Sequence, residues 1–437
     1  MPVLLHLMFD LDDTLVATAH LKDIREKHLS DKFEKALPQL KPYVGLLPAL
    51  HYLQGKVSLS VVTRSPGWYA KPILKHCFPD IRWNAVVTYE DVDRHKPYPD
   101  ALKQAMQTVG VTEFSQVAYI GDSRDDIEAA YHAGVRPVLA TWGGTQGVTN
   151  QLLPEVVLNN PTALCDLPTS YTRYLHVLEA YLAEKDEKWK EAGNVQPTRI
   201  SVPIQGKEMV VWVLGRYFAK EGVTLTLHNN HTLSQQIERK KSSGVFPIED
   251  SWVYAIAAVL GHMQVKYGAD LVTVVPAKPG RDRRLERLLE VYDRSTYPFV
   301  KLASAPDLLA FSEDAQTVKH ATSPERYQMV KEAIRAKNNQ LVVGEKVVLL
   351  DDVLTTGSTL QAAKETLIEA GASSVYPIAL AKNISRYSFE VTPEHKLCSK
   401  CGRLMVYRKN RTTGNVFWGC TGYPEHCRHT EDIPIAR

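Results

Sequence analysis

The chain has 437 residues, of which 44% are hydrophobic and 23% charged, and its formal net charge is +3. This length predicts two to three domains, and this composition is typical of a globular protein and excludes a disordered one. No apolar run reaches the roughly 18 residues of a membrane span, and the N-terminal stretch MPVLLHLMFD lacks a signal-peptide pattern. We therefore expect a cytoplasmic protein with no membrane partner.

The chain is expected to form four segments. Residues 1–168 alternate strand-like runs such as VSLSVVT and QVAYIGD with helical stretches, which predicts an α/β domain with a parallel sheet. Residues 169–196 have helical periodicity and a charged end, so we expect a linker helix. The alternation returns over 197–388 and predicts a second α/β domain. Residues 389–437 form a short module rich in cysteine, aromatic and basic residues.

The first domain begins with two acids at a strand end. In FDLDDT, Asp10 ends an apolar strand and Asp12 follows two residues later, so both carboxylates share a face at the edge of the sheet where ligands bind. One can attack a phosphate as a nucleophile while the other protonates the leaving oxygen and later activates water. Mg²⁺ would neutralise the crowded charge. The structural alternative is a strand followed by an acidic turn.

Further motifs of this domain supply groups that suit a phosphate. Thr63 ends the strand of SVVTRS, and Lys96 lies beside a proline in HKPYPD. The strand of VAYIGDSRDD ends on Gly121 and Asp122, and Asp126 follows one helical turn later. The motifs occur in the order found in the haloacid dehalogenase superfamily of phosphohydrolases, which this domain resembles.

The resemblance implies a role for each of these residues. Asp10 would be the nucleophile and Asp12 the general acid and base, and the acid at position 12 is typical of the phosphatase branch. Thr63 and Lys96 would bind phosphate. The implied Mg²⁺ ligands are Asp10, Asp12 through its carbonyl, and Asp122, with Asp126 supporting the metal. Because few residues separate Thr14 from Val57, we expect a minimal lid, which suggests a large substrate or a cover from another domain.

The second domain contains the string VVLLDDVLTTGST at 347–359. Backbone amides and hydroxyls at such a helix start bind a phosphate monoester, and the two acids suit the hydroxyls of a ribose. The alternative is a buried strand, an acidic turn and a capped helix. The string resembles the ribose-phosphate motif of type I phosphoribosyltransferases, and its surroundings resemble the competence-protein-F-like branch. The resemblance implies phosphoribosyl pyrophosphate as ligand, held by Asp351, Asp352, Thr355, Thr356, Gly357, Ser358, Thr359 and, in the pyrophosphate loop, Lys278.

The C-terminal module carries four cysteines in two close pairs, Cys398 with Cys401 and Cys420 with Cys427. This spacing predicts a closed structural Zn²⁺ site, which would stabilise a segment too short to build its own core. From Lys396 to the C-terminus, eight Lys and Arg face three Asp and Glu, so a polyanionic partner is expected.

The module resembles the four-cysteine fingers at the C-termini of type IA topoisomerases, which implies binding of single-stranded nucleic acid. Aromatic side chains would stack on bases and basic ones would meet phosphates. The alternative is a structural module that docks on the protein itself. The expected nucleic-acid contacts are Arg408, Lys409, Arg411, Phe417, Trp418 and Tyr423.

Taken together, the three modules predict a Mg²⁺-dependent phosphatase that processes or repairs nucleic-acid ends or damaged nucleotides. One alternative is nucleotide salvage, in which the second domain joins a base to phosphoribosyl pyrophosphate and the first removes the 5-phosphate. Another is that the second domain senses phosphoribosyl pyrophosphate and regulates the phosphatase.

Overall fold

The computed structural model describes most of the chain, namely residues 4–144, 147–183, 195–204, 206–220, 222–242, 248–296, 299, 301–312, 323–391, 398–403, 405–409, 416–420, 423 and 426–432. It divides into two compact units. The first contains residues 1–171, 218–228 and 384–437, and the second contains 172–217 and 229–383. Among the described residues, no helix combines the length and apolar composition needed to cross a membrane.

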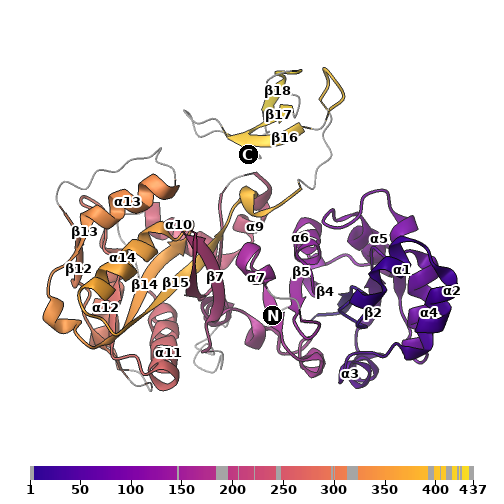
Figure 1. Cartoon of the computed structure of the whole chain (residues 1–437), viewed down its shortest axis with the longest axis horizontal. Helices are drawn as coiled ribbons and strands as arrows, with labels where there is room; N and C mark the ends of the chain where they lie inside the picture. Colours follow the sequence, from indigo (N-terminus) through magenta and orange to yellow (C-terminus); the bar gives the residue numbers. More distant parts are fainter. Residues whose placement is uncertain are drawn as a thin grey trace. The chain divides into compact units, whose positions relative to one another are not determined.

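The first unit is built on a six-stranded parallel sheet in the order β3-β2-β1-β4-β5-β6. Figure 1 draws these strands in indigo to magenta. Three of the four residues of β1 are buried, as expected of a parallel strand covered on both faces. The strands are β1 (His6–Phe9), β2 (Ser58–Val62), β3 (Ala85–Val87), β4 (Val117–Gly121), β5 (Arg136–Ala140) and β6 (Val156–Leu158).

The strand order places a topological switch point at β1. The chain runs outward from β1 to β2 and β3, then returns to β4 on the other side of β1. Phe9 pairs with Val61 of β2 and Ile120 of β4, so Asp10 lies where these central strands end. Ligands of open parallel sheets bind at such points. The sheet topology therefore accounts for the predicted position of the phosphate site.

Helices connect the strands of this sheet. Helix α6 begins with a capping box, in which Ser123 and Asp126 exchange side-chain and backbone hydrogen bonds, and it ends at Gly134, whose φ is +74°. The helices of this region are α1 (Lys22–Glu26), α2 (Ser30–Ala36), α3 (Leu46–Leu53), α4 (Gly67–Cys77), α5 (Asp100–Val109), α6 (Arg124–Ala133) and α7 (Val148–Gln151).

The lid predicted as minimal consists of short helices between β1 and β2. Helices α1 and α2 precede α3 along the chain. Phe33 of α2 packs against Trp68 and Tyr69 of α4, with ring centroids 5.4 and 4.9 Å apart. These contacts attach α2 to α4, and α1 contributes Arg25 to the site described below.

The second unit contains a sheet in the order β11-β10-β14-β15-β8-β7, with β9 paired to β15. Strands β10, β14, β15 and β8 run parallel, and β7 forms an antiparallel hairpin with β8. A separate pair, β12 with β13, is antiparallel. The strands are β7 (Thr198–Ile204), β8 (Lys207–Val213), β9 (Arg216–Phe218), β10 (Leu271–Val274), β11 (Ala303–Ser304), β12 (Leu309–Phe311), β13 (Ile334–Ala336), β14 (Lys346–Leu354) and β15 (Ser374–Ile384).

Helices accompany this second sheet, and Figure 1 shows α14 alongside β14. Buried side chains of α11 and α12 join those of β10, β14 and β15 in one core cluster. The helices from the end of the first domain onward are α8 (Val177–Ala183), α9 (Leu225–Asn229), α10 (Thr232–Ser242), α11 (Asp250–Tyr267), α12 (Arg284–Arg294), α13 (Ser323–Ala333) and α14 (Ser358–Glu369).

The region predicted as a linker helix, 169–196, differs from that prediction. Within it, α8 ends at Ala183, and Val177, Leu178 and Tyr181 are buried in the core of the second unit. An apolar face of this kind is stabilised by packing, so α8 belongs to the second domain rather than to a solvated connection. Residues 184–194 lie outside the described part of the chain. The unit boundaries also differ from the prediction, since 218–228 group with the first unit.

The C-terminal module forms a small antiparallel sheet of β16 (Met405–Lys409), β17 (Val416–Cys420) and β18 (Thr430–Asp432). Its buried cluster consists of Cys398, Met405, Trp418 and Cys420, with Cys427 against it. The α/β fold class predicted from the sequence is confirmed: a Rossmann-like parallel-sheet domain is followed by a second α/β domain and a small four-cysteine module.

Candidate active site

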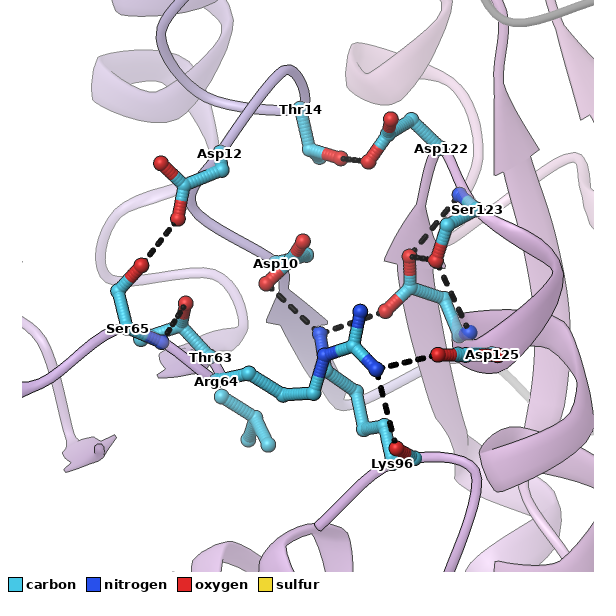
Figure 2. Close-up of polar contacts among 12 residues, drawn as sticks. Asp10, Asp12, Thr14, Thr63, Arg64, Ser65, Lys96, Asp122, Ser123 and Asp125 are labelled. Atoms are coloured by element: carbon cyan, nitrogen blue, oxygen red, sulfur yellow. Dashed lines mark hydrogen bonds and ion pairs between the residues drawn. The ribbon is translucent and has the colours of Figure 1, made fainter. Parts of the chain in front are cut away.

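Three carboxylates meet at the carboxyl ends of β1 and β4. Asp10, Asp122 and Asp126 each place an oxygen within 4.8 Å of the others. Asp10 is 8% exposed, Asp122 is 7% exposed and Asp126 is fully buried. The two strand ends and the first turn of α6 thus bring together three of the residues that the sequence predicts for the site. Figure 2 shows Asp10 and Asp122 of this cluster.

Lys96 is the cation of this cluster. Its Nζ lies 2.8 Å from Asp10 Oδ1 and 2.6 Å from Asp126 Oδ1, and it donates a 2.9 Å hydrogen bond to the hydroxyl of Tyr119. That hydroxyl donates to the carbonyl of Val62 at 2.8 Å. Burial alone would lower the pKa of Lys96, but the carboxylates of Asp10 and Asp126 raise it above its usual value. Lys96 therefore carries a fixed positive charge in the site.

The remaining negative charge is only partly compensated. Burial raises the pKa of Asp10 to about 7, opposed by Lys96, and burial followed by the charges of Asp126 and Asp10 raises the pKa of Asp122 to about 8. Asp126 behaves differently: burial would raise its pKa, but Lys96 and hydrogen bonds from Ser123 lower it. Burial is the main cause of both raised pKa values, and the neighbouring carboxylates add to it; a divalent cation beside these oxygens would favour their ionised forms.

Ser123 and Gly121 determine the position of the Asp126 side chain. Ser123 donates to Asp126 Oδ2 through its backbone N, at 3.0 Å, and through its Oγ, at 2.6 Å. A Cβ on Gly121 would lie 2.4 Å from the Asp126 side chain, so only glycine leaves room for this carboxylate. Thr14 Oγ1 donates to Asp122 Oδ1 at 3.0 Å and fixes the third acid.

Thr63 lies at the end of β2, as predicted, and is buried. Its Oγ1 accepts a hydrogen bond from the backbone N of Ser65 at 3.1 Å, which shapes the loop beside Asp10. The next residue, Arg64, extends outward, forms an ion pair with Asp125 and donates to the carbonyl of Lys96 at 3.4 Å. Figure 2 shows this loop on the same side of Asp10 as Asp12.

Asp12 is held by residues that the sequence analysis missed. Its Oδ2 pairs with Arg25 Nη1 at 2.8 Å and accepts a hydrogen bond from Ser65 Oγ. Its Oδ1 accepts from Thr18 Oγ1 at 2.6 Å and from the hydroxyl of Tyr69 at 3.2 Å. Arg25 comes from α1, so the short helices after β1 contribute directly to the position of Asp12. The excess of basic residues in KDIREKH gave no signal that pointed to one of them.

The second unit has a pocket of about 570 Å³ at the carboxyl ends of β10 and β14. The structure brings every residue predicted for the ribose phosphate to this pocket. Gly357 has a φ of +75°, and a Cβ there would lie 2.7 Å from Ile204, so the loop requires glycine. The predicted residues in the lining are Lys278, Asp351, Asp352, Thr355, Thr356, Gly357, Ser358 and Thr359.

Four further charged residues line this pocket: Arg281, Asp282, Arg284 and Glu286. Arg284 Nη2 lies 2.8 Å from Asp352 Oδ2, and the buried Glu286 accepts a hydrogen bond from the backbone N of Ala277 at 2.8 Å. Arg284 and Glu286 both belong to α12, which has the composition of an ordinary amphipathic helix. The ion pair places a cation against one of the two acids expected at a ribose.

The four cysteines of the C-terminal module gather as predicted. Their sulfur atoms all lie within 4.8 Å of one another, with Cys398 Sγ 3.6 Å from Cys427 Sγ and Cys401 Sγ 3.4 Å from Cys420 Sγ. None of them forms a disulfide. Ligands about 2.3 Å from a tetrahedral zinc ion are about 3.8 Å apart, close to the observed spacing.

The residues expected to contact nucleic acid differ in their exposure to solvent. Tyr423 is exposed and Phe417 is half-buried, but Trp418 is 3% exposed and packs with Cys398 and Met405. The prediction that Trp418 stacks on bases is therefore wrong, because its ring forms the core of the module. Arg408 and Lys409 lie on β16, whose backbone alone is described there, and Arg411 lies outside the described residues.

Comparison with protein families identifies two of the domains. Residues 19–140 match the family described as haloacid dehalogenase-like hydrolase, and residues 309–399 match the phosphoribosyl transferase domain. The chain thus contains a haloacid dehalogenase-like hydrolase domain and a phosphoribosyl transferase domain. Asp10 and Asp12 precede the first match, and Lys278 precedes the second.

Curated relatives match the first domain. The phosphoglycolate phosphatase of Salmonella typhi is 30% identical over 156 residues, which cover 34% of this chain and 60% of that protein. The phosphoglycolate phosphatase of Escherichia coli strain K12 is 30% identical over 153 residues, 34% of this chain and 59% of that protein. The chain thus spans about 60% of the length of these relatives.

The comparison with solved structures gives matches to part of the chain. One is a HAD-superfamily hydrolase from Geobacter sulfurreducens PCA, which is 19% identical in sequence. The match covers 38% of this chain and 99% of that chain, with a TM-score of 0.31. CbbY from Rhodobacter sphaeroides in complex with phosphate has 14% identity, with 37% of this chain and 96% of that chain covered, and a TM-score of 0.33.

Proposed function

We propose that the chain is a Mg²⁺-dependent phosphoric monoester hydrolase that acts through an aspartyl-phosphate at Asp10, and that its targets are phosphorylated nucleic-acid ends or damaged nucleotides. The observation that carries the proposal is the cluster at the sheet edge. There a buried Asp10 lies 2.8 Å from Lys96 and beside the carboxylates of Asp122 and Asp126. The residues proposed as nucleophile, as cation for phosphate oxygens and as metal ligands thus lie close to one another, which supports the proposal.

In the proposed reaction, a carboxylate oxygen of Asp10 attacks phosphorus, and the bond from phosphorus to the leaving oxygen breaks. Asp12 donates the proton that the leaving oxygen takes up. Asp12 then accepts a proton from water, whose oxygen attacks the same phosphorus, and inorganic phosphate leaves with Asp10 restored. Lys96 and Thr63 bind phosphate oxygens throughout.

The residues at the site fit a magnesium ion. Asp10 and Asp122 offer the hard oxygen ligands that Mg²⁺ prefers, and their carboxylate oxygens lie within 4.8 Å of each other. Asp12 would contribute its carbonyl oxygen. Asp126, which is paired with Lys96 and Ser123, would support the site by fixing Lys96. A bound Mg²⁺ would neutralise the charge that builds up on the phosphoryl group.

For the second domain, we propose that its pocket binds a phosphoribosyl ligand such as phosphoribosyl pyrophosphate. The phosphate would lie on the loop from Thr355 to Thr359, and the ribose hydroxyls would meet Asp351 and Asp352. Ribose binding at Asp352 would have to displace Arg284 or share the carboxylate with it. The pocket and the predicted residues in its lining support binding of such a ligand, and the proposal is limited to binding.

For the C-terminal module, we propose a structural zinc ion held by its four cysteines and contacts to single-stranded nucleic acid. The sulfur spacing supports zinc. The exposed Tyr423 and the basic composition from Lys396 onward support a polyanionic partner. The role proposed for the module is to retain a strand whose terminal phosphate is removed by the first domain.

The test is a phosphate-release screen of the full chain with Mg²⁺ over 3′- and 5′-phosphorylated DNA and RNA oligonucleotides, beside mononucleotides and sugar phosphates. The proposal predicts release from oligonucleotides that is lost in Asp10→Asn and weakened when the cysteines are replaced. If only mononucleotides or sugar phosphates are hydrolysed, equally well with the four cysteines changed to serine, the nucleic-acid part of the proposal fails.

A further inference from the structure

We propose that Tyr89, stacked on His95, is the surface on which a nucleobase of the substrate stacks while the phosphate of the same nucleotide lies at Asp10. The inference rests on the phosphatase function proposed above and names its substrate class: nucleoside monophosphates and the terminal nucleotide of a phosphorylated strand. Neither the sequence motifs nor the family resemblance assigns Tyr89 or His95 a role.

The Tyr89 and His95 rings form a stacked pair, the platform, that is partly exposed to solvent. Their centroids are 3.9 Å apart and their planes differ by 21°, so the rings are stacked. Tyr89 is nevertheless 48% exposed, which leaves ring surface available to solvent. A pre-stacked, partly exposed tyrosine loses little conformational entropy when a flat ligand is added, and every nucleobase has a π-face that can stack on it.

The platform is attached to the two loops that carry the phosphate site. The backbone N of Tyr89 donates to the carbonyl of Ser65 at 3.1 Å, and Ser65 contacts Asp12. His95 immediately precedes Lys96, whose Nζ lies 2.8 Å from Asp10. A ligand on Tyr89 is therefore held by the same loops as a phosphate at Asp10.

The sheet topology sets the distance between the platform and the nucleophile. Tyr89 follows the carboxyl end of β3, where Val87 pairs with Val62 of β2. Asp10 follows the carboxyl end of β1, which is the next strand after β2. Two strand spacings amount to about 10 Å along the same edge of the sheet. One nucleoside fills a gap of this order, whereas phosphoglycolate would leave the platform without a partner.

The charges around the platform favour a base over a second phosphate. Burial, with the nearby charge of Arg64, lowers the pKa of His95, so the imidazole is neutral at pH 7 and supports stacking without attracting an anion. Beyond Tyr89 lies a pocket of about 870 Å³ whose lining has an excess of acids: Glu90, Asp91, Asp93 and Asp100 against Arg94 and Lys103. These acids repel a polyphosphate chain, so the platform suits a terminal base and the rest of a strand must leave the site in another direction.

The experiment compares a nucleotide with the same sugar phosphate without its base. Values of kcat/KM are measured with Mg²⁺ for thymidine 5′-monophosphate, thymidine 3′-monophosphate and deoxyribose 5-phosphate. The variants are Tyr89→Ala, Tyr89→Phe and, as matched control, Tyr52→Ala. Tyr52 is 52% exposed on α3, and its ring is covered by Lys56 on the segment that leads into the amino end of β2, so it shares the exposure of Tyr89 without its position.

The proposal predicts that the wild type prefers at least one nucleotide over deoxyribose 5-phosphate. In Tyr89→Ala the ratio of the two kcat/KM values falls roughly tenfold, as loss of one stacked base predicts, while Tyr89→Phe and Tyr52→Ala keep the wild-type ratio. An equal loss on both substrates would show a structural role for Tyr89 and would overturn the proposal, as would an unchanged ratio in Tyr89→Ala.

A binding measurement separates the two proposals. Calorimetric titration of thymidine monophosphate into Asp10→Asn, with and without Tyr89→Ala, reports stacking in the absence of turnover. If the wild type hydrolyses no phosphomonoester but Tyr89→Ala weakens binding roughly tenfold, the platform stands and the phosphatase proposal fails. If hydrolysis depends on Asp10 but neither binding nor the ratio depends on Tyr89, the phosphatase stands and the platform is wrong.

Discussion

Lys96 Nζ lies 2.8 Å from the carboxylate of Asp10 at the centre of the first domain, and the same ammonium group lies 2.6 Å from Asp126. One cation thus compensates two buried acids, one proposed to attack phosphate and one proposed to support the metal. The positive charge of Lys96 that would bind a phosphate oxygen also stabilises the two buried carboxylates in the folded domain.

We therefore expect Lys96→Met to lose phosphatase activity and also to destabilise the first domain by about 3–5 kcal/mol, because it leaves buried carboxylates without their partner. Phosphate release and the free energy of unfolding in urea measure the two effects. Lys103→Met, on the exposed side of α5, is the control and should change neither by much. A stable, fully active Lys96→Met would show that the ion pair is incidental.

The parts of this site that could be predicted are those that follow from strand geometry. Asp10, Thr63 and Asp122 each end an apolar run, and the carboxyl ends of parallel strands meet at one edge. Arg25 and Tyr69 could not be predicted, because they reach Asp12 from helices whose placement depends on packing between segments distant in sequence. No local pattern distinguishes Arg25 from the other charges of its short helix.

A different reason explains the wrong prediction for Trp418. Residues two apart on a strand share a face, so Trp418 lies on the same side of β17 as Cys420, which the cysteine spacing already places inside the module. Strand periodicity applied to FWGC would have assigned Trp418 to the core. Similarly, α8 was mistaken for a linker because its apolar stripe is short and its contacts lie far along the chain.

The loop of the second domain gives a prediction with an internal control. Gly357→Ala should weaken thermal stabilisation by phosphoribosyl pyrophosphate, because the new Cβ would force Ile204 Cδ1, 2.7 Å away, to move beside the loop and the positive φ would be strained. Gly344→Ala also has a positive φ but meets nothing within 4 Å. It should cost a similar strain, about 1 kcal/mol, and keep the ligand response. Equal ligand responses in both variants would contradict ligand binding at this loop.

The cysteine cluster predicts that the purified chain contains stoichiometric zinc. Cys420→Ser should remove most of the zinc, because the buried Cys420 would supply one of the four ligands of a closed site. Cys165→Ser, which lies outside the cluster, should leave the zinc content unchanged. Elemental analysis by mass spectrometry measures both. If Cys420→Ser retained the full zinc content, the proposal that the four cysteines coordinate one zinc ion would be wrong.

His132 predicts a loss of stability in mild acid. Its Nδ1–H donates to the carbonyl of Pro97 at 3.2 Å, while its Nε2 is shielded from solvent with no hydrogen-bond partner in the part of the chain that the structure describes. Burial lowers the pKa of His132 from 6.5 to about 4. Because the folded pKa lies below the unfolded one, the contribution is complete above pH 6.5 and is lost as pH falls towards 4.

The expected size of this loss is about 3 kcal/mol in the free energy of unfolding of the first domain between pH 7 and pH 4. His132→Asn keeps a donor for the carbonyl of Pro97 but does not titrate. Its free energy of unfolding should therefore fall by about 3 kcal/mol less than that of the wild type between pH 7 and pH 4. Chemical denaturation of both proteins across this range gives the comparison. Identical pH dependence in the two would show that His132 is protonated without penalty in the folded state.

The most direct test of the central claim is acid quenching of the full chain during turnover of a phosphorylated substrate with Mg²⁺, followed by peptide mass analysis. The account predicts one phosphoryl group on the peptide that contains Asp10, stable in acid and removed by hydroxylamine, and neither label nor phosphate release in Asp10→Asn. Rapid phosphate release with no label, together with continued release in a folded Asp10→Asn, would contradict a covalent role for Asp10.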